Sequence, residues 1–398
     1  MFAPLDGVKV IDLTHVLAGP YCTQLLAQMG AEVIKVEPPG TGDLTRFGGA
    51  KPELNQQLMG LAFCTQNTDK ASITVNLKEP EGIEIVRRLV AGADVFVENF
   101  RPGVSERLGL GFDTLTALNP NLVYVSLTAY GQDGPIGHRP AYDHVVQAMS
   151  GVMETTGTDE MGPVKVGAPY VDYAAGQKGA MATMAAIMEQ RRTGEAQRVD
   201  NAMLDTTLLL MANTLTATAN TGQRPPKLGN QAASGSASSG CFETADGLLA
   251  VAANNDRQFR NLCQAIGRNE LADDERFAAH ADRQQNAKQF RALLAAELLA
   301  RGAAEWEQAL DTVGVPAARV RAMDELIKEG QPAARGLLRE VEVAGATVQL
   351  PTAGFKVNGE VPGPMEPPHA LGADNHAVLA DLGYDEAEVA TMEDKGVI

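Results

Sequence analysis

The chain has 398 residues, of which 44% are hydrophobic and 21% are charged, a balance typical of a globular protein with two or three domain-sized units. Its formal net charge of −17 argues against nucleic acids and anionic membranes as partners. The four cysteines form no C-x-x-C pair, and neither a leader peptide nor an apolar membrane span is recognisable. We therefore expect a cytoplasmic protein with free thiols and no metal site.

The first half of the chain predicts alternating strands and helices. A strand at 8–13, a helix at 21–29 that ends at Gly30, and a strand at 31–37 form a β-α-β unit, the building block of parallel α/β sheets. Elements of the same kinds follow, namely strand-like segments at 73–77, 94–98 and 122–128, an extended segment at 165–171, and helices at 81–90, 173–192 and 202–214. The sequence therefore predicts an α/β fold with a parallel sheet.

The second half changes character at residues 219–226, whose Gly and Pro residues predict a linker. A flexible Gly- and Ser-rich loop at 234–240, a strand or hairpin at 242–252 and amphipathic helices over 257–310 indicate a smaller α-rich domain. Strand character returns at 340–350, and an acidic helix precedes the C-terminal residues.

Several common catalytic motifs are missing from the sequence. There is no G-x-G-x-x-G after the first strand, no G-x-x-x-x-G-K-[ST], no G-x-S-x-G and no H-E-x-x-H. These absences argue against dinucleotide, ATP, serine-hydrolase and zinc-protease sites. The six His residues are scattered, which argues against a His-based metal site.

Asp172 is the carboxylate with the most suggestive position. It lies between the extended segment 165–171 and the helix predicted from Tyr173, at the expected N-cap, where backbone N–H groups and the helix dipole favour a negative charge. Asp is a common N-cap residue, and a structural role is the more frequent case. The alternative is an exposed, ionised carboxylate at the carboxyl edge of the sheet, able to act as a nucleophile.

Three other segments have both a functional and a structural interpretation. The loop 99–103 follows a strand, and with the nearby Arg107 it suits an anionic ligand or is a solvated turn. The loop 234–240 is a mobile lid over a site or a plain linker. His144 is a lone histidine near a predicted helix start, where a packing or surface role is more common than catalysis.

Short segments that follow one another along nearly the whole chain carry a family resemblance. They are PLDGVKVID at 4–12, AGP at 18–20, GAEVIKVE at 30–37, GD at 42–43, NLK at 76–78, ENFRPG at 98–103, QAMSG at 147–151, the segment around Asp172, LGY at 382–384 and GVI at 396–398. Together they resemble the class III CoA-transferase family (CaiB/BaiF type), which also includes carnitine CoA-transferases, formyl-CoA transferases and α-methylacyl-CoA racemases.

The resemblance implies a fold and a site. It implies a Rossmann-like large domain whose parallel sheet is built from both chain ends (1–218 and 331–398), a linker and small domain at 219–330, and an interlocked homodimer. It implies that Asp172 attacks a donor acyl-CoA, giving a mixed anhydride and then an aspartyl-CoA thioester, with no metal and no tightly bound cofactor. By position, the CoA-binding residues would be Val16, Val75, Lys78, Asn99, Phe100 and Arg107, and the substrate or lid residues Leu17, Tyr142, Asp143, Gly235, Ser238, Ser239 and Gly240.

Departures from the resemblance narrow the chemistry. Racemases of the family have a catalytic His where this chain has Tyr142, and His144 is about 200° further around a helix, which disfavours α-proton abstraction. Formyl-CoA transferases have a Gln at the position of Leu17, which disfavours an oxalate/formate pair. We therefore predict CoA transfer from succinyl-CoA to a small dicarboxylic acid such as malate, mesaconate or itaconate. A racemase and a non-catalytic acyl-CoA-binding protein are the alternatives.

Overall fold

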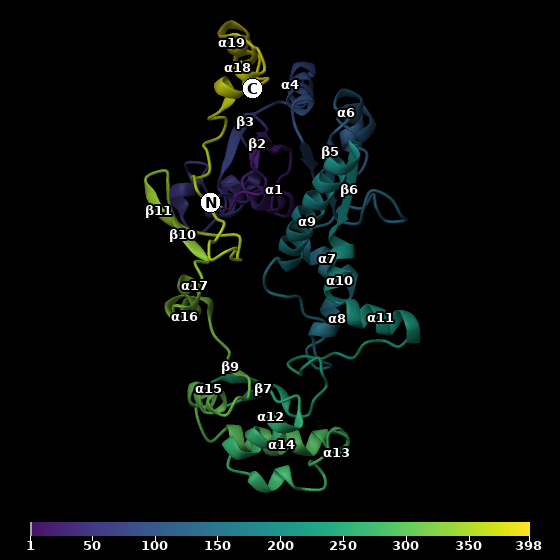
Figure 1. Cartoon of the computed structure of the whole chain (residues 1–398), viewed down its shortest axis with the longest axis vertical. Helices are drawn as coiled ribbons and strands as arrows, with labels where there is room; N and C mark the ends of the chain where they lie inside the picture. The colour runs from purple at the N-terminus through teal and green to yellow at the C-terminus, as the bar shows by residue number, and fades with distance from the viewer. Residues whose placement is uncertain (1) are drawn as a thin grey trace. The chain divides into compact units, whose positions relative to one another are not determined.

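The computed structural model describes residues 2–398, which divide into two compact units (Figure 1). Unit 1 contains the residues up to 153 together with 165–223 and 332–398, and unit 2 contains 154–164 and 224–331. The chain therefore crosses between the units at four places. The segment 154–164, which the sequence assigned to the large domain, belongs to the smaller unit.

A six-stranded parallel sheet forms the centre of unit 1, in the order β3-β2-β1-β4-β5-β6. Its strands are β1 (Lys9–Asp12), β2 (Glu32–Glu37), β3 (Lys70–Thr74), β4 (Val95–Glu98), β5 (Val123–Thr128) and β6 (Gln197–Ala202). This order places a topological switch point between β1 and β4, where open α/β sheets bind ligands beyond the carboxyl ends of the strands. The predicted α/β fold with a parallel sheet is confirmed.

Two details of the predicted sheet are wrong. All six strands come from the N-terminal half, so the sheet is not built from both chain ends. The C-terminal segment instead pairs with itself, as the antiparallel hairpin of β10 (Leu338–Val343) and β11 (Ala346–Pro351). The edge strand β6 was missed, because only Val199 in its core is apolar and the rest of the segment reads as polar.

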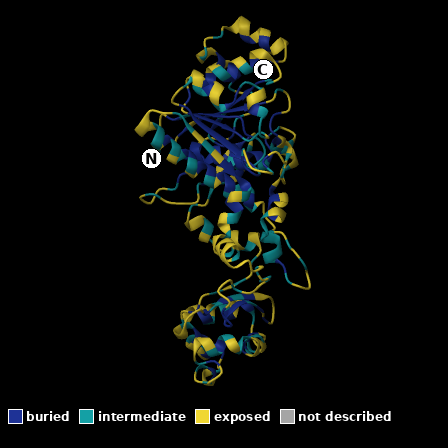
Figure 2. Ribbon diagram, turned by 90° about the vertical axis from the view of Figure 1, so that its right-hand side faces the viewer, coloured by how far each residue is buried: buried dark blue, intermediate teal, exposed yellow. Residues whose placement is uncertain are grey.

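Helices cover both faces of the sheet and bury its side chains (Figure 2). On one face, residues such as Ile11 and Phe96 pack against α4 (Pro80–Ala91), α6 (Phe112–Leu118), α18 (Asn375–Asp381) and α19 (Glu386–Asp394). On the other face, residues such as Val10 and Val125 pack against α1 (Ala18–Gln28) and α9 (Tyr170–Thr193). The C-terminal helices therefore complete one layer of unit 1, although the C-terminal segment adds no strand to the sheet.

The outer edge of β3 is covered by the C-terminal segment. The Ser72 N–H donates to the Asp374 carboxylate (2.7 Å) and the Thr74 N–H to the Asn375 side-chain oxygen (2.8 Å). Just beyond the strand, the Asn76 N–H donates to the Val397 carbonyl (2.7 Å). Residues about 300 positions away thus satisfy the backbone donors that an edge strand leaves open.

The remaining helices of unit 1 are short or lie around its rim. They are the 3₁₀ helix η1 (Leu44–Phe47), α2 (Pro52–Asn55), α3 (Leu61–Asn67), α5 (Val104–Arg107), α7 (Asp143–Ser150), α10 (Met203–Leu210) and α11 (Ala212–Thr221), with α8 (Val152–Thr156) and α17 (Gln331–Ala334) at the unit boundaries. The predicted helix 202–214 is thus two helices. The predicted linker begins too early, because α11 runs to Thr221 before Gly222 ends it in a left-handed conformation.

Unit 2 is a small three-stranded sheet packed with helices. The antiparallel strands β7 (Ser239–Glu243), β8 (Leu248–Ala252) and β9 (Ala317–Arg319) confirm the predicted hairpin and add a third strand. Its helices are α12 (Asp256–Ala265), the 3₁₀ helix η2 (Asn269–Ala272), α13 (His280–Gln285), α14 (Ala287–Leu298), α15 (Ala303–Thr312) and α16 (Met323–Lys328). Phe259, Phe290 and Trp306 lie in its own hydrophobic core, which agrees with the predicted α-rich region.

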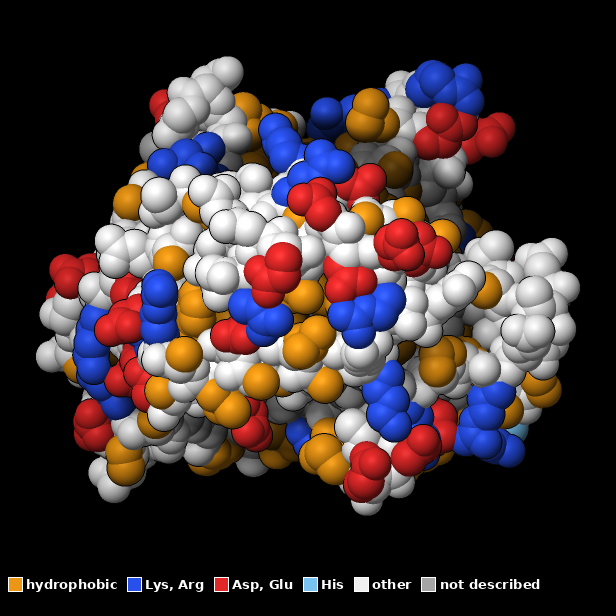
Figure 3. Space-filling view, turned by 90° about the horizontal axis from the view of Figure 1, so that it is seen from below, with side chains coloured by type: hydrophobic (Ala, Val, Ile, Leu, Met, Phe, Trp, Pro, Cys, Tyr) orange, Lys and Arg blue, Asp and Glu red, His pale blue; other side chains and the backbone are white. Residues whose placement is uncertain are grey.

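Acidic and basic side chains are interspersed on the face that Figure 3 shows, without one large basic patch. Among residues 2–398, no helix is long and apolar enough to span a bilayer.

Candidate active site

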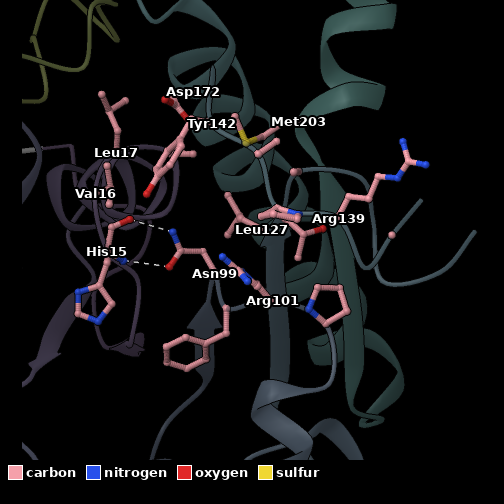
Figure 4. Close-up of a pocket in the computed structure, with 18 residues that line it drawn as sticks. His15, Val16, Leu17, Asn99, Arg101, Leu127, Arg139, Tyr142, Asp172 and Met203 are labelled. Atoms are coloured by element: carbon pink, nitrogen blue, oxygen red, sulfur yellow. Dashed lines mark hydrogen bonds between the residues drawn. The ribbon is translucent and has the colours of Figure 1, made fainter. Parts of the chain in front are cut away.

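A cavity of about 310 Å³ opens at the carboxyl ends of β1, β4 and β5, within unit 1 (Figure 4). Its walls come from the loops that follow these strands and from the first turn of α9. The lining residues are His15 to Ala18, Asn99 to Pro102, Leu127 to Ala129, Gly137, Arg139 to Tyr142, Asp172 and Met203. The cavity therefore lies at the switch point of the sheet, where the topology favours a ligand site.

Asp172 lies on the wall of this cavity, but it is not the N-cap of its helix. The helix α9 begins at Tyr170 with Pro169 as its N-cap, so Asp172 is the third helical residue. Burial, and secondly the neighbouring Asp143 carboxylate, raise the pKa of Asp172 to about 7. The side chain is half-buried and accepts no hydrogen bond from another described side chain or backbone group. Such a carboxylate is poorly solvated and free to react.

Asp143 supplies the cap that α9 lacks. Its Oδ2 accepts the backbone N–H groups of Val171 (2.8 Å) and Asp172 (3.2 Å), and its Oδ1 accepts the Gln147 side-chain N–H (2.6 Å). Asp143 is only 8% exposed and does not line the cavity. The residue predicted to face the substrate thus orients the helix that carries Asp172.

The loop between β1 and α1 forms the opposite wall. Asn99, which follows β4, forms two hydrogen bonds to the backbone of His15. Its side-chain oxygen accepts the His15 N–H (2.9 Å), and its side-chain nitrogen donates to the His15 carbonyl (2.8 Å). Val16 has a positive φ of 73°, an uncommon conformation for a β-branched residue. Backbone strain of this kind concentrates at functional sites.

The other predicted CoA-binding residues are spread along the carboxyl edge of the sheet. Phe100 lines the cavity, whereas Lys78 and Arg107 do not and are exposed cations in the segments that follow β3 and β4. Val75 is 2% exposed and packs in the core under this edge, and its role in CoA binding stays a prediction. The structure therefore brings together Val16, Leu17, Asn99, Phe100, Tyr142 and Asp172 in one cavity.

Several residues of the cavity, among them His15, Arg139 and Met203, were not singled out from the sequence. His15 lies three residues after the end of β1, and burial, then the nearby Lys35, lower its pKa, so its imidazole is neutral at neutral pH. Arg139 and Met203 also line the cavity. His144, which was weighed as a catalyst, is exposed and lies outside it. The position of His15 after the first strand of an α/β sheet was a usable signal, because loops at that edge bind ligands.

The predicted lid segment is folded into unit 2. Ser236 to Gly240 are buried, the Ser238 hydroxyl donates to the Ala253 carbonyl (2.6 Å), and Ser239 and Gly240 belong to β7. Only Ser234 and Gly235 are exposed, so the expectation of a flexible loop over 234–240 is wrong for most of its length. The lid role of Gly235, Ser238, Ser239 and Gly240 stays a prediction.

Within residues 2–398, no group of three or more His, Cys, Asp or Glu side chains is arranged to hold a metal ion. The four cysteines form no disulfide, and Cys22, Cys64 and Cys263 are buried.

Known proteins resemble this chain over nearly its whole length. A family model described as CoA-transferase family III matches residues 5–375. The succinyl-CoA:glutarate CoA-transferase of Mus musculus is 35% identical over 99% of this chain and 90% of that protein. The succinate–glutarate CoA-transferase of Agrobacterium fabrum is 39% identical over 87% of each. The crystal structure of a CAIB/BAIF family protein from Brucella suis has a TM-score of 0.82 and 33% identity, and covers 96% of this chain and 100% of that one.

Proposed function

This chain belongs to CoA-transferase family III and is a CoA-transferase, and on that premise we propose that it moves CoA from succinyl-CoA to a small dicarboxylic acid through Asp172. The observation that carries the proposal is a half-buried carboxylate, without hydrogen-bond donors among residues 2–398, on the wall of a cavity at the switch point of the sheet. With a pKa near 7, this carboxylate is about half ionised at neutral pH and is little stabilised by solvent.

The proposed reaction exchanges one thioester for another. An Asp172 oxygen attacks the donor thioester carbonyl, the C–S bond breaks, and CoA leaves as the thiolate while a mixed anhydride forms. The thiolate then attacks the Asp172 carbonyl, which releases the donor acid as its carboxylate and leaves an aspartyl-CoA thioester. The acceptor carboxylate repeats these two steps in reverse order and restores the Asp172 carboxylate. A carboxylate is a weak nucleophile, and positioning in the cavity compensates by raising its effective concentration.

A dicarboxylic substrate is supported by the two relatives, whose names specify succinate and glutarate. It is also supported by Arg101, an exposed residue that lines the cavity and forms no ion pair with an acidic residue in the described part of the chain. In Figure 4 the Arg101 side chain is drawn beside Asn99, whereas that of Arg139 extends away from the other labelled residues. Arg101 would pair with the carboxylate that does not react.

Intact-protein mass spectrometry tests the covalent step. After incubation with succinyl-CoA and then hydroxylamine or borohydride, we expect a modification that maps to Asp172. The modification should be lost in Asp172→Ala and kept in Asp113→Ala, a control carboxylate in the first turn of α6. If a panel of acyl-CoA donors gives no adduct, or if Asp172→Ala still gives it, the covalent route through Asp172 is wrong.

A substrate panel tests the choice of acid. We expect Arg101→Gln to raise the KM for succinate and glutarate about tenfold or more, in line with the loss of a charge-assisted hydrogen bond, and to leave the KM for a monocarboxylic acceptor unchanged. Equal losses for both kinds of acid would assign Arg101 to CoA binding. Exchange of an α-proton with deuterated water, without transfer, would support the racemase alternative, and CoA binding without turnover would support the non-catalytic one.

We also propose that the protein works in the cytoplasm as a homodimer. Self-association is supported by exposed apolar side chains on neighbouring helices of unit 1, including Met181 and Met188 on α9 and Leu209 and Leu210 on α10. CoA is a substrate and not a resident cofactor in this proposal. Sedimentation analysis of the full chain should give twice the monomer mass of 42.0 kDa.

A further inference from the structure

The segment 13–17, which connects β1 to α1, is held from both sides of the switch point. β1 lies between β2 and β4 in the sheet, and side chains from the residues of both neighbours reach the connecting segment. Its central residue, Val16, is in the left-handed region with a φ of 73°, where a β-branched residue is strained. A conformation of this kind persists only when its surroundings enforce it.

On the β4 side, Asn99 uses both its side-chain oxygen and its side-chain nitrogen on the backbone of His15, as described above. Asn99 matched a CoA-binding position, but after these two hydrogen bonds its side chain has only one lone pair and one N–H left for a ligand. Its role in the structure is to hold the backbone that precedes Val16.

On the β2 side, Asp43 and Lys35 hold the two neighbouring backbone groups. The Asp43 Oδ2 accepts the Val16 N–H (3.0 Å), and the Lys35 Nζ donates to the Thr14 carbonyl (2.7 Å). Asp43 and Lys35 also form an ion pair with an N–O distance of 3.4 Å, and their side chains are 0% and 1% exposed. Burial of two charges is costly, so the pair is tolerated only because each charge is compensated.

The electrostatic surroundings keep Asp43 ionised. Burial alone would raise the pKa of Asp43, but Lys35, the Thr45 N–H and the nearby His15 outweigh it, so that the pKa is lowered. The other groups that face Asp43 are the Glu37 carboxylate, which accepts the Asp43 N–H (2.9 Å), and the His15 imidazole, 3.8 Å from Oδ2. A permanent carboxylate therefore faces the Val16 N–H.

We propose that Asp43 is a positioning residue for CoA transfer: through the Val16 N–H it fixes the wall formed by residues 15–18, opposite Asp172, in the shape that binds the CoA thioester. The proposal rests on the proposed function, because it assigns that wall to the CoA substrate. Asp43 itself does not line the cavity, and it acts on the substrate only through the backbone of the loop.

The isosteric substitution Asp43→Asn removes this hold for a specific reason. The Asp43 Oδ1 accepts both the N–H (2.9 Å) and the hydroxyl (2.8 Å) of Thr45, while Oδ2 accepts the Val16 N–H. An Asn side chain has one acceptor oxygen, so it can satisfy Thr45 or Val16 but not both. If the Asn oxygen keeps the hydrogen bonds from Thr45, the Asn side-chain N–H faces the Val16 N–H, and this contact between two donors opposes the left-handed turn.

The experiment compares Asp43→Asn with Asp69→Asn. Asp69 is a control in the same unit, because it also accepts two backbone N–H groups, of Met365 and Glu366, but both on Oδ1, so that an Asn can keep them, and it lies outside the cavity. For each variant we would measure the dissociation constant for free CoA by calorimetry, the KM and kcat with succinyl-CoA, and the unfolding temperature. We expect Asp43→Asn to weaken CoA binding and raise KM about tenfold, and Asp69→Asn to change the unfolding temperature but neither constant.

A second pair of variants tests whether Asp43 acts through Val16. Glycine adopts a positive φ without help, so the effect of Asp43→Asn should be smaller in a Val16→Gly background than in the wild type. If Lys35 without its counter-charge prevents folding, Lys35→Met/Asp43→Asn removes both charges and is compared with Lys35→Met alone, because Lys35 also holds the Thr14 carbonyl.

The outcomes separate the inference from the proposed function. Unchanged CoA affinity and KM in Asp43→Asn, or effects that simply add in the Val16→Gly background, would overturn the positioning role. A wild-type protein that binds CoA but transfers it to no acid would overturn the proposed function alone, because the CoA affinities still decide the role of Asp43.

Discussion

The raised pKa of Asp172 predicts how the rate of CoA transfer depends on pH. The nucleophile is the ionised carboxylate, so the reactive fraction grows as the pH rises through about 7. This is the opposite of the flat profile expected for a solvated Asp, which is fully ionised above about pH 5. The perturbations are the pH itself and the substitution Asp143→Asn.

The size of the effect follows from the titration curve. With a pKa of about 7, roughly a tenth of Asp172 is ionised at pH 6 and roughly nine tenths at pH 8. The kcat/KM for succinyl-CoA, which reports the free enzyme, should therefore rise about tenfold between these pH values.

Asp143→Asn should move this profile to lower pH. The substitution removes the second cause of the raised pKa, the neighbouring negative charge, while burial, the first cause, is kept. An Asn at this position can keep its oxygen on the N–H groups of Val171 and Asp172 but then loses the hydrogen bond from the Gln147 side chain, so the unfolding temperature is measured beside the pH profile to check that the start of α9 stays in place.

The assay is kcat/KM for succinyl-CoA from pH 5 to 9 at constant ionic strength, followed by chromatography of the product thioester. The CoA phosphate titrates near pH 6 and could mimic an enzyme group, so the series is repeated with the dephospho-CoA thioester. A flat profile between pH 6 and 8, or a midpoint that Asp143→Asn leaves in place, would refute the assignment of the ionised Asp172 as the nucleophile.

Three further predictions concern neighbouring features. Burial raises the pKa of Glu98 to about 7, so the free energy of unfolding should fall, by up to about 3 kcal/mol, as the pH rises from the ordinary pKa of a Glu to above 7. Glu98→Gln should abolish this fall in denaturant unfolding, and an unchanged pH dependence would contradict the prediction. A Cβ at Gly176 would lie 2.7 Å from the Ala18 carbonyl oxygen, so Gly176→Ala should lower the free energy of unfolding by about 1–3 kcal/mol and reduce CoA transfer. Gly167→Ala, where a Cβ meets open space, should do neither. Equal effects of the two substitutions would refute the close contact of α1 and α9. Cys241 is half-buried and the other three cysteines are buried, so one thiol should react with a maleimide in the native protein and four after unfolding; a second fast thiol would contradict this.

Much of unit 1 was predictable because its elements are defined by local pattern. The strands β1, β2, β4 and β5 each contain β-branched or aromatic apolar residues within a short segment, as expected for strands of a buried sheet. The start of α9 was not predictable in this way, because it depends on Asp143, about 29 residues earlier in the chain. For that reason the local sequence predicted Asp172 as the N-cap, whereas it is the third residue of the helix.

The buried charges beneath the site were also hidden from sequence reasoning. Lys35 and Lys70 are both buried, since each meets a carboxylate: Asp43 for Lys35 and Asp12 for Lys70. The Lys70–Asp12 pair joins β3 and β1, which lie on either side of β2, and the Lys35–Asp43 pair depends on how the loop after β2 folds back; sequence pattern provides neither. Asp172 and the loop 99–103 were singled out from their positions in the sequence, Val16, Leu17 and Tyr142 only by the resemblance, and His15 was missed.

The covering of β3 by residues 374, 375 and 397 has a consequence for synthesis of the protein. During translation, the sheet strands emerge long before these residues, so the β3 edge stays open to other nascent or misfolded chains until the last stretch is made. A chain that is cut before residue 370 would keep every strand of the sheet and the whole cavity, yet expose this edge permanently. Premature termination near the 3′ end of the message should therefore yield aggregates and not a weakened enzyme.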